Sequence, residues 1–485
     1  MLYPNFRILV RVTAVMMLTF LIASCSIAQG SNYDSSKKFT PEQLQEDFDF
    51  IVQKLEEIHP SLYAFTSEVE FAELAADTKS KLTRDLTELE FQNFSRKFVK
   101  NVRCGHTAIS PSPAWYQYIK EEQKILPFKI FIHEEKIFIR YSNAADSLLF
   151  YGTQITKIDQ VEASVMLKEM RELQQIDGFS KGYENKSIER LFQTYHLFLY
   201  GVKDSYQIEF INKLGKKEEF KISSNVTENK LVRLASSNAT EIKITGSNFY
   251  LREELGQAAL LDINSFPSRG YRKYYKSVFK KIKKENIDHL IIDLRGNGGG
   301  YFPNSTRLLR YLLDEEFSLD FSNTKSKVKT NKNIKLGNID KLTKSMFNLI
   351  PDRNKLDPKR NYSLSFKPKK KHVFDGKIYL IIDGASFSMS AYVATKLKHL
   401  TDATIVGQET GGGEIGSNAL LWYHIFLPHS KLKLAIPYYF LDHDVQPELI
   451  GRGVIPDIPV SYKLTEKLNR VDKEMLTIEK LIQNN

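Results

Sequence analysis

Cysteine is nearly absent from this sequence, in which 485 residues include only Cys25 and Cys104. A fold held together by several disulfides is therefore excluded. The sequence also lacks the paired Cys and His spacings of zinc sites and the HExxH pattern of zinc hydrolases. We expect no metal ion and no other cofactor in this protein.

Long apolar runs are also scarce, and the clearest one lies at the start of the chain. Arg7 and Arg11 precede the apolar stretch 12–23, and small residues follow it, which is typical of a secretion signal. The letters IASC fit a bacterial lipobox with Cys25 as the lipidated residue, whereas SIAQ suits ordinary signal cleavage, and both remain open. We expect residues 1–28 to be a signal and the protein to be exported to the bacterial cell envelope, either free in the periplasm or anchored to the membrane by lipid.

Acidic residues are outnumbered, since 58 Asp and Glu accompany 69 Lys and Arg. The excess is local: residues 323–372 hold 15 Lys or Arg and three acids, and a second basic run covers residues 271–286. The first run indicates a solvated insertion, and the second indicates a helix with a solvent-exposed, basic face. Because no basic motif interleaved with aromatic residues occurs, we expect no nucleic-acid partner.

The patterns change along the chain in an order that predicts its domains. With 42% hydrophobic residues the chain can bury real cores, and its length favours two or three domains. Helical spacing dominates first, then short paired strands, and finally strands that alternate with helices. The predicted parts are, in order, a helical N-terminal domain at 30–112, a small β-rich, PDZ-like domain at 113–240, an α/β layered domain at 241–465 with the basic insertion at about 323–372, and a C-terminal helix within 466–485.

A glycine-rich segment follows one of the predicted buried strands and has the sequence DLRGNGGG at 293–300. A phosphate cradle would need spaced glycines or a following Lys, and neither is present. A plain turn stays open. The third reading is a pair of N–H groups held out for an oxyanion, since glycine has no Cβ to shield them. Asp293 and Arg295 would brace this loop rather than react.

A second strand leads directly into a predicted helix at GASFSMSAYV, with Ser386, Ser388 and Ser390 at the junction. A serine in the first turn of a helix suits a nucleophile, because the positive end of the helix stabilises a developing alkoxide. The N–H of Met389 would point toward the same anion, as in a nucleophile elbow, although GxSxG itself is absent. Simple N-capping by serine is the alternative and stays open.

A serine nucleophile needs a base with a near-neutral pKa, and histidine is the usual one. His106, in NVRCGHTAIS, lies where the helical part meets the β-rich part. A single histidine is more often structural than catalytic, and spacing does not choose among the ten present. Glu448 and Asp457 are candidates for orienting the histidine, and both also suit turn or surface contacts.

Four motifs, LIIDLRGNGGG, GASFSMS, ATIVGQETGGG and GRGVIPDIPV, stand in the order found in the tail-specific peptidases. That family includes the C-terminal processing peptidases, the tricorn core and the repeats of the retinoid-binding protein of the eye. The likeness is strong over residues 291–460, and CGHT resembles the family's DGHT. It implies a crotonase-like βα core behind helical and PDZ-like parts, and serine endopeptidase activity on a peptide or protein substrate.

The resemblance also implies roles for single residues. Ser388 falls on the nucleophile, and the oxyanion hole falls on the N–H groups of Met389 and of Gly298 or Gly299. Gly413 stands where the Ser–Lys branch of the family has its lysine, so a Ser–Lys dyad is disfavoured.

The sequence is closer to the tricorn-like and retinoid-binding branch, which takes its base from the GHT motif and orients it with a glutamate. His106 matches that base. Ile450 occupies the spacing expected for the glutamate, so we predict that Glu448 orients His106. Hydrolysis would then proceed through an acyl-enzyme on Ser388.

Two other functions stay open. One is a catalytically silent envelope lipoprotein of the same fold that binds a ligand or peptide. The other is an adhesive or structural lipoprotein whose basic face binds acidic glycans. The sequence predicts no oligomeric state.

Overall fold

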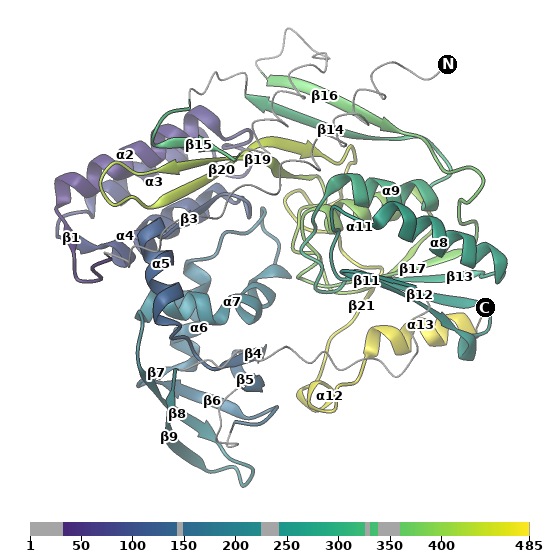
Figure 1. Ribbon diagram of the computed structural model, residues 1–485, viewed down its shortest axis with the longest axis horizontal. Helices are drawn as coiled ribbons and strands as arrows, with labels where there is room; N and C mark the ends of the chain where they lie inside the picture. Colours follow the sequence, from purple (N-terminus) through teal and green to yellow (C-terminus); the bar gives the residue numbers. More distant parts are fainter. Residues whose placement is uncertain (1–32, 143–148, 225–241, 325–329, 338–358, 485) are drawn as a thin grey trace.

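The computed structural model describes residues 33–142, 149–224, 242–324, 330–337 and 359–484. The predicted signal at 1–28, with Cys25, lies outside these residues. Among the helices that are described, none combines the length and the apolar character needed to cross a membrane. The chain is a mixed α/β protein with several sheets, as predicted (Figure 1).

The N-terminal part is helical, and its three long helices all begin at a capping box. At Thr40, Ser67 and Thr87, the side chain accepts a hydrogen bond from the third helical N–H, and the third helical side chain accepts one from the cap N–H. Helical elements dominate this part, as the spacing of its apolar residues predicts. The elements are β1 Lys38–Phe39, α2 Pro41–Ile58, α3 Glu68–Ser80, β2 Leu86–Thr87, α4 Glu88–Val99 and the 3-10 turn η1 Lys100–Val102.

The second part is a β-rich layer packed on helices. The short paired strands predicted for this part are present, and the first two form a hairpin in which Glu134 and Glu135 make the turn with positive φ angles of 44° and 59°. The strand order is β4-β5-β6-β8-β9, with β7 beside β6. The long helix α7 was not predicted. The elements are α5 Pro113–Glu122, β4 Phe128–His133, β5 Lys136–Ser142, β6 Gln154–Ile158, β7 Val161–Glu162, α6 Ala163–Glu172, α7 Tyr183–Tyr200, β8 Ser205–Ile211 and β9 Lys217–Ser223.

The third part contains a seven-stranded sheet in the order β10-β11-β12-β13-β17-β18-β21, in which the strands from β12 to β21 are parallel. Its elements are β10 Ile242–Ile244, β11 Ser247–Arg252, the 3-10 turn η2 Glu253–Leu255, β12 Ala258–Ile263, α8 Tyr271–Lys284, β13 His289–Asp293, α9 Phe302–Leu312, β17 Lys377–Ile382, α11 Met389–Leu400, β18 Thr404–Gly407, β21 Ile458–Pro459, α12 Leu464–Leu468 and α13 Lys473–Gln483.

Both faces of this sheet are covered, which explains why its central strands read as continuous apolar runs. Leu290 and Ile292 of β13 belong to the main core with the apolar side of α8, whereas Ile291 packs with Ile478 and Ile482 of α13. Figure 1 shows α8, α9 and α11 on one face and α13 on the other. The Lys and Arg side chains of α8 face solvent, as predicted.

A second sheet of six strands joins the third part to the N-terminal part. Its order is β15-β19-β20-β14-β16, and β3 pairs with β20 as a branch. Its strands are β3 Ala108–Ser110, β14 Phe317–Thr324, β15 Ile334–Leu336, β16 Lys359–Phe366, β19 Gly416–Phe426 and β20 Lys433–Asp442.

The prediction that residues 323–372 form a solvated insertion is wrong for part of that range. β15 and β16 lie within it, and both are paired in the second sheet. Tyr362 is 1% exposed and stacks on Phe321 at 5.3 Å between ring centroids. The many lysines in this range made its overall composition polar, so the few apolar side chains that anchor these short strands gave no recognisable sequence pattern.

Candidate active site

Two loops leave the third part's sheet at the same edge. β13 and β17 are parallel neighbours in which Asp293 pairs with Ile381. Their carboxyl ends therefore coincide, which is where α/β sheets usually place ligands. The loop after β13 is the glycine run predicted to hold an oxyanion, and the loop after β17 carries the three serines.

Asn297 joins these loops to the rest of the sheet. Its side chain is fully buried, donates to the carbonyl of Ile263 at 2.8 Å and accepts from the N–H of Gly299 at 2.9 Å. Its carbonyl accepts from the N–H of Phe387 at 3.0 Å. Asn297 therefore fixes the glycine loop through its side chain and connects it to the serine loop through its backbone carbonyl.

The three serines have different surroundings. Ser386 is buried, donates through Oγ to the carbonyl of Leu294 at 2.8 Å and accepts from the N–H of Asp383, so it braces the loop. Ser390 is buried on the helix. Ser388 is partly exposed, and its side chain does not cap the helix, so simple N-capping is not its role.

The backbone at Ser388 is strained. Its φ is 55° and its ψ is −122°, a conformation that non-glycine residues rarely adopt. Strain of this kind is costly and clusters at functional sites. The strained turn between β17 and α11 leaves Ser388 partly exposed, as in a nucleophile elbow.

Gly299 lies directly against this turn. A Cβ added to Gly299 would lie 2.8 Å from Ser388 Cβ and 2.9 Å from the backbone nitrogen of Met389, and φ at Gly299 is +97°. Only glycine fits here, because both the space and the backbone conformation exclude a side chain.

Two backbone N–H groups beside Ser388 donate no hydrogen bond to any described residue: those of Gly298 and Met389. The N–H of Gly299 is already taken by Asn297. A Cβ added to Gly298 would lie 3.1 Å from Nη1 of Arg190, so a guanidinium from α7 lies beside the Gly298 backbone. Sequence reasoning did not find Arg190, since nothing near it in the chain marks it.

His106 reaches the serine loop through the second sheet. It precedes β3, and Ala108 of that strand pairs with Ala435 of β20. The imidazole stacks on Phe387 at 4.8 Å between ring centroids. The ring of Trp422 is tilted against the imidazole, with 6.3 Å between ring centroids, and its Nε1 donates to the His106 carbonyl at 3.3 Å. Because Phe387 is the residue before Ser388, the predicted histidine and the predicted serine lie in one neighbourhood.

The two side chains do not yet form a hydrogen bond with each other. Burial lowers the pKa of His106 to about 4, so its imidazole is neutral at physiological pH. Its Nδ1 is buried and has no hydrogen-bond partner among the described residues. Long or unmade catalytic hydrogen bonds are common when no substrate is bound.

Glu448 is not in the position predicted for it. It is exposed in the bend after β20, and it does not contact His106 Nδ1, which has no partner. Asp457 accepts a hydrogen bond from the N–H of Ile405 at 2.8 Å and thereby holds β18. Neither acid orients the histidine in this structure. The segment that follows Glu448 instead packs on the turn after Asp177, where the N–H of Phe179 donates to the carbonyl of Gly451 at 2.6 Å.

A different acid lies beside the His106 loop. Asp177 is buried, accepts from the N–H of Gly105 at 2.7 Å and also faces the N–H of Gly413. Burial raises the pKa of Asp177 to about 7, and the two backbone donors only partly oppose the rise. Asp177 thus links the histidine loop to the loop that lies against Ser388, where Gly412 would place a Cβ 2.9 Å from the Ser388 nitrogen.

Residues 257–460, which contain both loops and Ser388, match the model of peptidase family S41. This region is therefore similar to peptidase family S41. The predicted resemblance to tail-specific serine peptidases is thereby confirmed at the level of the family, and the family is one of serine-type peptidases.

A relative supports the S41 assignment. The probable CtpA-like serine protease of Staphylococcus epidermidis is 23% identical over 238 residues, which are 48% of this chain and 40% of that protein. The chain thus matches less than half the length of this curated relative.

Solved structures share the fold over most of the chain. Mature CPAF is 13% identical with a TM-score of 0.64, and the likeness covers 92% of this chain and 98% of that one. Mature CPAF complexed with lactacystin gives a TM-score of 0.66 at 13% identity over 92% and 99% of the two chains. At this identity the likeness is one of fold, and it includes parts outside the S41 region.

Proposed function

We propose that this protein is a serine endopeptidase of the bacterial cell envelope that cleaves peptide bonds through an acyl-enzyme. The observation that carries the proposal is the strained, partly exposed Ser388 at the carboxyl edge of the sheet, with Gly299 against it and His106 stacked on its neighbour Phe387. No other histidine of the described chain stacks on the serine loop.

The proposed chemistry follows from these positions. Ser388 Oγ attacks the peptide carbonyl carbon while neutral His106 takes its proton. The carbonyl oxygen becomes an oxyanion and accepts hydrogen bonds from the N–H groups of Gly298 and Met389, at the positive end of α11. The guanidinium of Arg190 adds positive charge beside it. His106 then protonates the leaving amine, and water hydrolyses the ester on Ser388.

His106 is neutral in this structure, as a group that takes the serine proton has to be, although burial places its pKa below the near-neutral value that suits a general base. Because burial lowers its pKa, the base is unprotonated over a wide pH range. Its ring is fixed by aromatic packing, since Phe387 lies between His106 and Tyr183, at 4.9 Å from the latter. We propose that this stack replaces an orienting carboxylate.

The remaining predictions belong to the same proposal. We propose that the third part is a crotonase-like core, that the β4–β9 layer is PDZ-like, and that the domain boundaries are those predicted from the sequence. Export as a lipoprotein through Cys25, or after ordinary signal cleavage, is also proposed. The tricorn-like and retinoid-binding branch is favoured because Gly413 stands where the other branch has its lysine.

A catalytically silent binding protein of the same fold is the second candidate. It is favoured by one observation, the unpartnered Nδ1 of His106, which lacks the acid that a complete triad would supply.

Reaction with a fluorophosphonate, followed by intact-mass analysis, distinguishes the two candidates. We expect one adduct on the wild type and none on Ser388→Ala or His106→Ala. Ser390→Ala is the matched control, because this serine lies two residues further along and is buried, and it should keep the adduct. A folded wild type that gains no adduct would contradict the peptidase proposal and favour the binding protein.

A further inference from the structure

The second sheet presents a partly exposed face that begins at the candidate active site. Along β19, Trp422, His424 and Phe426 alternate with buried Tyr423 and Ile425. Because side chains alternate across a strand, the first three share one face.

Neighbouring strands extend this face on both sides. On β20, Lys433 pairs with Phe426 and Ala435 pairs with His424. On β15, Lys335 pairs with His424 from the opposite side. The face therefore contains aromatic side chains flanked by lysines.

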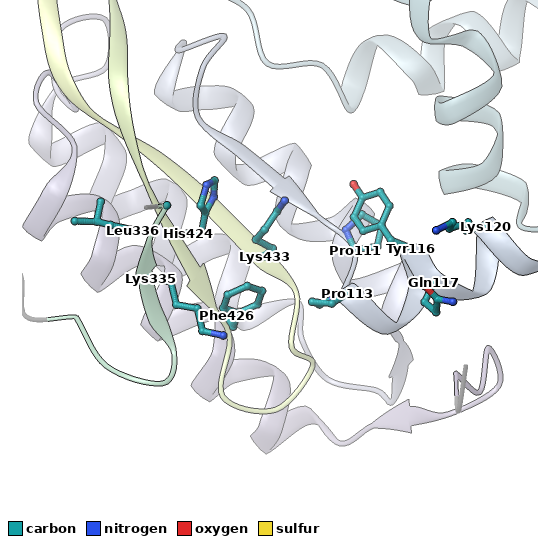
Figure 2. Close-up of a pocket in the computed structure, with 11 residues that line it drawn as sticks. Pro111, Pro113, Tyr116, Gln117, Lys120, Lys335, Leu336, His424, Phe426 and Lys433 are labelled. Carbon is teal, nitrogen blue, oxygen red and sulfur yellow. The ribbon is translucent and has the colours of Figure 1, made fainter. Parts of the chain in front are cut away.

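A pocket of about 580 Å³ lies at the end of this face that is farther from Trp422. Figure 2 shows Lys335, Phe426 and Lys433 from the strands on one side and Tyr116 and Lys120 from α5 on the other. Its volume is in the range of sites that bind small groups or side chains.

The charge of the pocket has one sign. Lys120, Lys335 and Lys433 line it, and among the described residues no aspartate or glutamate does. None of the three forms an ion pair with a described residue. Instead, the ammonium group of Lys433 lies 5.8 Å from the ring centre of Tyr116, and that of Lys335 lies 5.1 Å from that of Phe426.

An anion bound there would offset the mutual repulsion of three ammonium groups, and the aromatic rings would cover its aliphatic part. A glutamate or aspartate side chain meets both requirements, since it carries a carboxylate on a short apolar stem.

The pocket and the histidine are joined along the strands. Trp422, which donates to the His106 carbonyl, lies four residues before Phe426 on β19, a distance of about 14 Å at roughly 3.4 Å per residue. From His106, the chain itself leads through β3 to Pro111 and Pro113 of the pocket wall. The rings of Phe387 and His106 are 4.8 Å apart, and those of His106 and Trp422 are 6.3 Å apart. An extended peptide with its scissile bond at Ser388 would cross this stretch and the 14 Å along β19 in about four to eight residues.

We propose that this pocket, the lysine pocket, binds an acidic side chain of the peptide substrate about four to eight residues from the scissile bond. The inference rests on the proposed peptidase function and deepens it, because it assigns a substrate class: extended peptides with an acidic residue at a fixed distance from the cleaved bond.

The test uses the full-length mature protein and a set of internally quenched peptides. One glutamate is moved along the positions three to eight residues from the cleaved bond, on either side, and each peptide has a glutamine partner. We expect one window of positions where Glu raises kcat/KM over Gln by about fivefold, mainly through KM, and an effect that weakens with salt.

Lys335→Gln/Lys433→Gln should reduce this Glu-to-Gln ratio to about one. The matched control is Lys276→Gln/Lys280→Gln on the exposed side of α8, which removes the same charge away from the pocket and should keep the ratio. Circular dichroism and the unfolding midpoint show whether each variant is folded.

Binding of the same peptides to Ser388→Ala, followed by fluorescence anisotropy, gives a readout that does not depend on turnover. Cleavage without any positional preference for Glu would overturn the pocket and leave the peptidase proposal intact. Preference that persists in the lysine-pocket variant would also overturn it, as would equal affinity of Ser388→Ala for Glu and Gln peptides. Absence of both cleavage and fluorophosphonate adduct, with Glu-selective binding retained, would instead reject the peptidase and keep the pocket.

Discussion

At the scale of single residues, the site depends on which backbone N–H groups are left unused. Asn297 occupies the N–H of Gly299 and thereby leaves those of Gly298 and Met389. Two glycines of the run are therefore required for different reasons. Gly299 is needed for its size and conformation, whereas the role that we propose for Gly298 depends on its N–H.

The orientation of His106 gives a prediction at this scale. Since aromatic rings hold the imidazole and Glu448 is exposed, Glu448→Gln should lower kcat/KM by less than about threefold. A carboxylate that orients a catalytic histidine would cost about 10⁴ when replaced. Steady-state kinetics on a cleaved peptide measure this, with His106→Ala as the inactive reference. A loss of two orders of magnitude or more would mean that Glu448 moves onto His106 when substrate binds.

At the scale of elements, Asp177 connects two loops that approach Ser388 from different parts of the chain. Its folded-state pKa of about 7 lies above the ordinary value of 3.8. Between these values the folded state binds more protons than the unfolded state. The stability contributed by protonated Asp177 is therefore full below about pH 4 and is lost as the pH rises through 7.

Asp177→Asn should remove this loss. The free energy of unfolding of the wild type should fall relative to the variant as the pH rises from 4 to 7, by at most about 1.4 kcal/mol per pH unit. Denaturant titrations at pH 4.5, 6 and 7.5 measure the difference. A difference that stays constant over this range would show that Asp177 is ionised in the folded protein.

Elements with strong local patterns could be predicted from the sequence, and elements defined by distant pairing could not. The helix after Thr40 and the strands before the two loops have capping, periodicity and apolar runs. β19 has no such contrast, because aromatic side chains lie on both its faces and leave no polar period.

The residues of the candidate site also differ in whether local sequence patterns could identify them. Ser388 and the glycine run could be found because each follows a recognisable strand. The contact of His106 with Phe387 depends on β3 pairing with β20, and no local pattern encodes a pairing between such distant segments. Asp177 lies in a short turn that resembles many others, so its role became visible only in the fold.

At the scale of the whole molecule, Arg295 ties the glycine loop to the C-terminal helix. Its guanidinium bonds to Asp293, to Asp472 at 2.8 Å and to Glu474 at 3.2 Å. Glu474 is 2% exposed, and its carboxylate accepts hydrogen bonds from this cation and from the Tyr462 hydroxyl. The loop before Gly298 and the helix that covers the far face of the sheet thus share one ionic contact.

Arg295→Met should destabilise the protein by about 3 kcal/mol, because it leaves buried carboxylates without their cation. It should also slow fluorophosphonate labelling of the folded fraction, since the glycine loop loses its brace. Chemical denaturation and labelling rates measure both effects, and Lys280→Met on the exposed side of α8 is the control. Unchanged stability would show that the ionic contact adds nothing to the fold.

The pairing of β3 with β20 has a consequence for how the protein is made. A ribosome completes His106 early, Ser388 much later, and the strand that seats the histidine later still. The centre that we propose therefore cannot assemble on a nascent chain before β20 has been translated. The order of these residues along the chain delays the activity that we propose until late in synthesis.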